Sequence, residues 1–139
     1  MLKRTLTYKN YDGETITEDF YFNFTKAELT MMELSESGGM SAMLERIVNE
    51  KDTKKIASIF EDIILKSVGK KSDDGKRFIK RGVAELFKET EAYSDLFMEL
   101  ILDEQKAADF VKAIMPPKAE LDEVKAKTDA AISRFEASN

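Results

Sequence analysis

The hydrophobic pattern of this chain changes from the period of a strand to the period of a helix at a single residue, Thr25. The residues before it, 14–24, are rich in aromatic side chains and are typical of an extended strand. The residues after it, Thr25-Lys26-Ala27-Glu28, form a capping-box sequence, in which the threonine hydroxyl and the glutamate carboxylate each accept from the other's backbone N–H. The switch therefore predicts a strand that leads directly into a capped helix ending near Ser35.

A second strand is expected just upstream. Residues 3–8 alternate in character, and Asn10-Tyr11-Asp12-Gly13 supplies a turn, because glycine adopts a positive φ without steric cost. The sequence thus predicts a β-hairpin over about residues 3–24. Two strands are marginally stable alone, so this hairpin must pack on other elements. Its expected apolar face consists of Leu6, Ile16, Phe20, Phe22 and Phe24.

The remainder of the chain is predicted to be helical. Four segments, within residues 40–48, 56–64, 93–101 and 107–115, repeat the spacing of an amphipathic helix with one buried stripe. Shorter features are a helix over Val83–Lys88, a polar loop over 70–81, and Thr90 as the cap of the helix that follows. The predicted fold class is mainly α, with the N-terminal β-hairpin packed on a bundle of about five to six helices.

The character of the sequence changes at Pro116-Pro117, where the last of the four segments must stop. Beyond it, an a/d-like seam of Leu121, Val124, Thr128, Ala131 and Phe135 predicts one further helix, which is marginal alone. We therefore expect one helical domain over 1–115 and a C-terminal helical tail over 116–139.

The composition excludes several kinds of protein. Cysteine and histidine are both absent, so the chain has no disulfide, no Cys nucleophile, and none of the usual zinc ligands or neutral-pH bases. The net charge of −5 argues against broad affinity for nucleic acid. No apolar run approaches the ~20 residues of a membrane span. We expect a binding or assembly protein with no enzymatic activity, metal or cofactor.

Two local motifs remain weak candidates for ligand sites. Gly69-Lys70-Lys71-Ser72 lacks the upstream glycine of a phosphate-binding loop, and the basic neighbours of Asp73-Asp74-Gly75 disfavour calcium. The dense basic cluster within 70–81 could contact nucleic acid or an acidic partner, although a solvated loop is the simpler interpretation. Phe78-Ile79 in its middle is expected to anchor this loop to the core.

Methionine is the more suggestive residue type. The chain has seven methionines and no tryptophan, and methionine side chains adapt to irregular partner surfaces. We expect Met43 and Met98 to fill the core. Met31 and Met32 are adjacent on one helix, so one of them should be exposed. The residues predicted to contact a partner are Met31, Met32, Met40, Leu121, Val124, Ile132 and Phe135.

Two stretches, EDFYFNFTKAELTMMELS and KSDDGKRFIK…FKETEAYSDLFMELILDEQKAADFVKAIMP, carry a family resemblance. From about Leu2 to Pro116 the chain resembles the small tail assembly chaperones of long-tailed, siphovirus-type bacteriophages that infect Gram-positive bacteria. The tail after Pro117 adds nothing to this resemblance, and no family site residue is carried over.

The resemblance implies a non-enzymatic role in the cytoplasm of the infected cell. Such proteins bind the tape measure protein, a long helical chain, and keep it soluble until the tail tube polymerises. They are then left out of the virion, and a longer frameshift product often exists. We expect several copies to coat the client or to self-associate, with the tail tube protein as a further candidate partner. The alternatives are a structural virion component and a nucleic-acid-binding regulator that uses the basic cluster.

Overall fold

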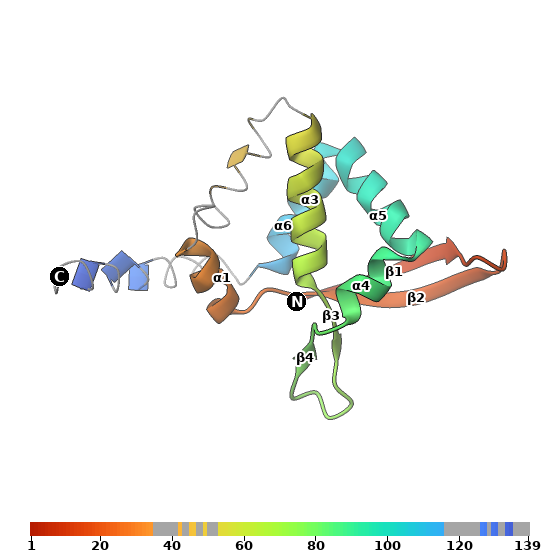
Figure 1. Cartoon of the computed structure of the whole chain (residues 1–139), viewed down its shortest axis with the longest axis horizontal. Coiled ribbons are helices and arrows are strands. Elements are labelled where there is room, and N and C mark those ends of the chain that lie inside the picture. Colours follow the sequence, from red (N-terminus) through yellow and green to blue (C-terminus); the bar gives the residue numbers. More distant parts are fainter. Residues whose placement is uncertain are drawn as a thin grey trace.

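The computed structural model describes residues 1–34 and 53–115, together with residues 42, 45–46, 49, 126–127, 129–130 and 133–134. The elements, shown in Figure 1, are β1 (Leu2–Lys9), β2 (Thr15–Phe22), α1 (Lys26–Glu33), α3 (Thr53–Ser67), β3 (Val68–Lys71), β4 (Phe78–Ile79), α4 (Val83–Lys88), α5 (Glu91–Leu102) and α6 (Glu104–Ile114).

The predicted N-terminal hairpin is confirmed. β1 and β2 pair antiparallel along their whole length, from Leu2 opposite Phe22 to Lys9 opposite Thr15. The turn closes through the Asn10 side chain, which accepts from the N–H groups of Asp12 and Glu14. Gly13 takes a φ of 79°, which few other residues adopt readily.

The sheet is larger than a hairpin. It has four antiparallel strands in the order β1-β2-β3-β4. The prediction of a polar loop over 70–81 was therefore wrong. Helix α3 stops at Ser67, because the chain turns directly into β3. Gly69 allows close packing here, since a Cβ built on it would lie 2.4 Å from the Phe78 ring. Both strands are short, and β3 is half lysine, so an analysis of hydrophobic period does not detect them.

The helices cover one face of the β1–β2 hairpin. Along β1, half-buried and exposed residues alternate strictly, so that Leu2, Leu6 and Tyr8 face the helices. Helices α5 and α6 contact β1, and α3 contacts both β2 and α5. Arg4 on the same face forms an ion pair with Glu99 of α5, 2.7 Å between Nη2 and Oε2. The core beneath the sheet contains Phe22, Phe60, Ile63, Ile64, Val68, Phe87, Leu96, Leu100, Phe110, Val111 and Ile114.

Helix α1 starts as the sequence predicts. The Thr25 hydroxyl accepts from the N–H of Glu28, 3.1 Å, and Glu28 Oε1 accepts from the N–H of Thr25, 2.9 Å. The other Glu28 oxygen pairs with Lys80, which follows β4. Phe24 is buried, and its N–H donates to the Ile114 carbonyl at the end of α6. These contacts tie α1 to two distant parts of the chain.

The other described helices agree closely with the sequence. Helix α4 has the predicted bounds, the Thr90 hydroxyl caps α5 by accepting from the Tyr93 N–H, and α6 ends before Pro116. Asp103 caps α6, a signal that the sequence analysis did not use. The mainly α class with an N-terminal hairpin is thus correct, with a larger sheet. The helix expected over 40–48 and the C-terminal tail lie outside the continuously described residues, so the boundary at 116 stays a prediction.

Candidate binding surfaces

Helix α1 presents an exposed apolar pair. The adjacent methionines diverge as expected: Met31 is 68% exposed, whereas Met32 packs against the core. Leu34, just after the helix, is 53% exposed and lies three residues from Met31, which places both on one side of the turn. Met31 is therefore available for a partner contact, and Met32 is not available to the same extent.

The other predicted contact residues lie outside the described part of the chain. They are Met40, Leu121, Val124, Ile132 and Phe135. Met43 also lies outside it, so its expected core role stays a prediction.

Helix α5 carries a second exposed apolar pair that the sequence analysis missed. Met98, expected in the core, is 47% exposed, so that expectation was wrong. Leu102, one turn further on, is 77% exposed. The buried stripe of α5 runs through Leu96 and Leu100, and positions 98 and 102 lie on the opposite side of the helix. Reading the off-stripe positions of the same helix would have identified this pair.

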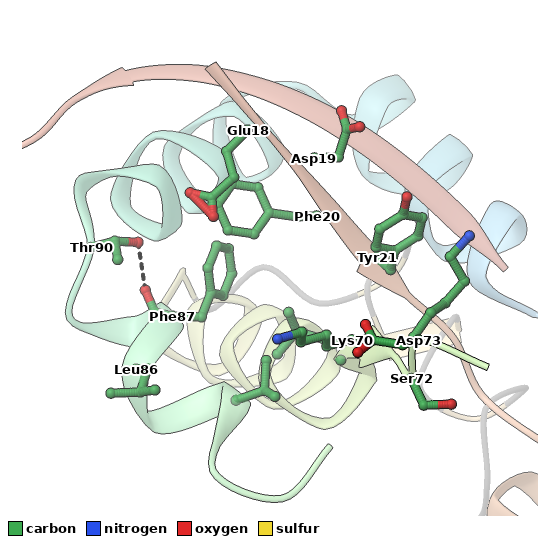
Figure 2. Close-up of a pocket in the computed structure, with 14 residues that line it drawn as sticks. Glu18, Asp19, Phe20, Tyr21, Lys70, Ser72, Asp73, Leu86, Phe87 and Thr90 are labelled. Carbon is green, nitrogen blue, oxygen red and sulfur yellow. Dashed lines mark hydrogen bonds between the residues drawn. The ribbon is translucent and has the colours of Figure 1, made fainter. Parts of the chain in front are cut away.

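A groove of about 690 Å³ opens between β2 and β3, where the two strands separate (Figure 2). We call it the β2–β3 groove; its walls are residues 18–21 and 68–73, and its floor is α4. Phe20 and Phe87 lie side by side in it, with ring centroids 4.9 Å apart. Leu86 at its rim is 71% exposed, and Val83 also lines it. The groove is thus a concave, mainly apolar surface.

The charged side chains of the β2–β3 groove differ in how they are engaged. Glu18 accepts from the Tyr8 hydroxyl at 2.8 Å, and Asp19 accepts from the Thr5 hydroxyl at 2.6 Å. Burial, with help from Glu18, raises the pKa of Tyr8. The side chain of Lys70 has no ion-pair or hydrogen-bond partner among the described residues. Asp73, which also lines the groove, has no described partner either, so Lys70 and Asp73 are the two charges of this groove that are not engaged.

The basic cluster belongs to the β3–β4 hairpin, which projects away from α3 in Figure 1. Lys80 is held by Glu28 and lies over the Phe24 ring, 4.8 Å from its centroid. Lys71 lies over the Tyr21 ring at 4.9 Å. The remaining members of the cluster are exposed: Lys70, Lys76, Arg77 and Arg81.

The turn of this hairpin explains one of its two acidic residues, Asp74. Asp74 Oδ1 accepts from the Ser72 hydroxyl and from the Lys76 N–H, and the first of these bonds lowers the pKa of Asp74. Gly75 takes a φ of 72°. The aspartate therefore builds the turn, as the sequence suggested, and not a cation site.

Within the described residues, no three His, Cys, Asp or Glu side chains come together in a way that could hold a metal ion. No helix in the same part of the chain is long and apolar enough to cross a membrane.

The comparison with protein families is decisive for what kind of protein this is. The model of the phage tail assembly chaperone family matches residues 1–137. The chain belongs to this family. The match extends through the C-terminal tail, so it is longer than the resemblance that we had placed between Leu2 and Pro116. No curated protein and no solved structure matches the chain.

As a member of this family, the chaperone takes part in tail assembly. Its partners are therefore expected to be phage tail proteins. The described surfaces of this chaperone that suit a protein partner are the Met31–Leu34 pair, the Met98–Leu102 pair and the β2–β3 groove.

Proposed function

We propose that this tail assembly chaperone binds the tape measure protein through exposed apolar side chains and keeps it soluble until the tail tube polymerises around it. It acts without enzymatic activity, in the cytoplasm of a Gram-positive host infected by a siphovirus-type phage, and is absent from the finished virion. The observation that carries the proposal is the presence of Met31 and Leu34 as an exposed apolar pair on a chain of this family.

The physical properties of the chain support such a role. A protein that holds an aggregation-prone client needs apolar surface that is adaptable and contacts that are individually weak. Met31 supplies an unbranched, polarisable side chain, and the net charge of −5 keeps the complex in solution. Several copies on one long client gain avidity from these weak contacts, so we expect multi-copy coating or self-association.

Co-expression with the tape measure protein tests the proposal. The chaperone should raise the soluble fraction of the tape measure protein and co-purify with it. A Met31→Ser, Leu34→Ser variant should lose most of this effect and keep its fold, because both side chains are more than half exposed. Met98→Ser is the matched control, since it removes an exposed methionine from another surface.

If the wild-type chaperone neither solubilises nor retains the tape measure protein, the proposal is wrong. If the double variant binds normally while Met98→Ser does not, the contact lies on α5 and not on α1. Mass spectrometry of purified virions separates the chaperone from the alternative of a structural virion component, because the proposal requires the protein to be missing there.

The exposed basic residues of the β3–β4 hairpin support one second candidate function, binding of nucleic acid. These side chains, Lys70, Lys76 and Arg77 on the hairpin and Arg81 just after it, form a small positively charged surface that could contact phosphates. Salt-dependent DNA binding near physiological ionic strength, lost on Lys76→Glu, would favour this candidate.

A further inference from the structure

The β2–β3 groove contains a free strand edge. The hydrogen bond from the Asn10 N–H to the Glu14 carbonyl shows that even-numbered residues of β2 direct their backbone groups toward β1. The hydrogen bond from the Asn23 N–H to the Ser67 carbonyl shows that odd-numbered residues direct theirs toward β3. Pairing between β2 and β3 nevertheless ends at Tyr21 opposite Gly69.

The backbone groups of Thr17 and Asp19 therefore point to the side of the separating strands. Among the described residues, β3 pairs with β2 only at Tyr21 and Phe22, and no turn or loop backbone group bonds to Thr17 or Asp19. An unpaired edge of this kind is completed by one chemistry in particular, the main chain of another extended segment. The edge thus specifies an extended occupant and not a helical one.

The floor of the groove specifies the side chains of that occupant. Phe20, Val83, Leu86 and Phe87 present an apolar surface on the inner side of the sheet. Figure 2 shows this floor between Phe20 and Leu86. In a strand added beside β2, every second side chain would point onto it. These positions should be aliphatic.

The charged side chains of the groove indicate which charge the occupant should carry. Val68 is buried on the inner side, and Lys70 lies two residues further along β3, so it belongs to the same side as the floor. Glu18 and Asp19 are already engaged by hydroxyl groups, and Asp73 lies in the turn beyond the end of β3. The Lys70 side chain is thus the charge on the floor side of the strands that has no described partner. The complementary occupant therefore carries a carboxylate at the end that reaches Lys70.

We propose that the β2–β3 groove binds an extended segment of a partner protein by strand addition to the Thr17–Asp19 edge. The segment has aliphatic side chains at alternate positions and an acidic residue beside Lys70. This proposal does not require the segment to come from the tape measure protein. It therefore goes beyond the function proposed above.

The first test uses a synthetic peptide of about eight residues, with valine alternating with threonine and aspartate at both ends. Titrated into the isotopically labelled full chain at up to about 1 mM, it should shift the amide signals of Thr17 and Asp19 and slow their hydrogen exchange. N-methylation of the peptide amides that face β2 should weaken binding by about tenfold or more, because those N–H groups donate to the edge. N-methylation of the alternate set should leave binding intact.

The second test uses variants of the chain. Leu86→Glu should weaken the peptide by about tenfold, and Leu102→Glu is the matched control, since Leu102 is similarly exposed but lies on α5. Equal thermal midpoints for the two variants would show that both remain folded. Lys70→Glu should weaken the aspartate-ended peptide and favour one that ends in lysine, whereas Lys76→Glu should do neither.

Four results would overturn the inference: no binding up to about 1 mM, equal effects of both N-methylation patterns, peptide-induced shifts along β1 in place of β2, or a concentration-dependent dimer that Leu86→Glu abolishes. The last would make a second copy of this chain the occupant. None of these results depends on the tape measure protein, so failure here leaves the proposed function standing.

Discussion

The carboxylate of Glu28 joins two parts of the fold, and separating its two roles gives a quantitative prediction. One oxygen closes the capping box of α1, and the other pairs with Lys80, which lies over the Phe24 ring. Glu28→Gln keeps an acceptor for the Thr25 N–H and removes the charge. Glu28→Ala removes both. Lys80→Met keeps an apolar stem over the aromatic ring and removes the cation.

The magnitudes follow from burial and geometry. The two charged side chains are 25% and 35% exposed, so their pairing should contribute about 0.5–1 kcal/mol. The capping interaction adds about 1 kcal/mol. We therefore expect Glu28→Gln to lower the free energy of unfolding by about 0.5–1 kcal/mol and Glu28→Ala by about 1.5–2 kcal/mol. For a chain of 139 residues, 1 kcal/mol corresponds to about 3 °C in the thermal midpoint.

Urea denaturation of the four members of the Glu28→Gln, Lys80→Met cycle measures the coupling directly. The coupling energy should be about 0.5–1 kcal/mol and should fall in high salt. Hydrogen exchange should accelerate in α1 before it does so in α5, because α1 has a single buried residue, Leu29. A coupling energy below about 0.3 kcal/mol, or Glu28→Gln as costly as Glu28→Ala, would refute this division of roles.

Three further predictions concern the sheet and the core. Gly69→Ala should destabilise the protein by about 1–3 kcal/mol in thermal denaturation, and Phe78→Leu should recover part of the loss by making room for the new Cβ. Burial chiefly raises the pKa of Tyr93 above its ordinary value of 10.0. Its neutral form is thus favoured by folding, and stability should fall as pH rises above about 10; Tyr93→Phe should make this decline shallower in urea titrations at alkaline pH. Leu96→Ala, at a fully buried site, should cost about 2–5 kcal/mol by the same denaturation assay, and an effect below about 1 kcal/mol would contradict the described core.

Features encoded by neighbouring residues were predictable from the sequence. The capping box at Thr25, the Asp-Gly turn before β2 and the cap at Thr90 each depend on a few adjacent side chains and backbone groups. Helix α4 has the expected bounds because its end signals are equally local. The period of the buried stripes identified α3, α5 and α6 for the same reason.

Features that depend on distant segments were not predictable. Strand β3 exists because residues 68 and 69 meet β2, almost fifty positions earlier in the chain, and a two-residue strand such as β4 has no period of its own. The β2–β3 groove arises from the separation of strands that pair over only two residues, which no local pattern encodes. The exposure of Met98 likewise depends on which side of α5 its neighbours cover.

The contacts of the first 24 residues have a consequence for biosynthesis. Arg4 forms an ion pair with Glu99, and the Phe24 N–H donates to the Ile114 carbonyl. The segment that is synthesised first therefore obtains these contacts only when the last helices of the described core, α5 and α6, have been made. At a translation rate of about 5–20 residues per second, roughly 5 to 19 seconds separate the synthesis of the two partners in each pair. During that interval the nascent hairpin lacks the contacts that α5 and α6 make with β1. Ribosome pausing before codon 114 should therefore prolong the exposure of Phe22 and increase capture by host folding factors.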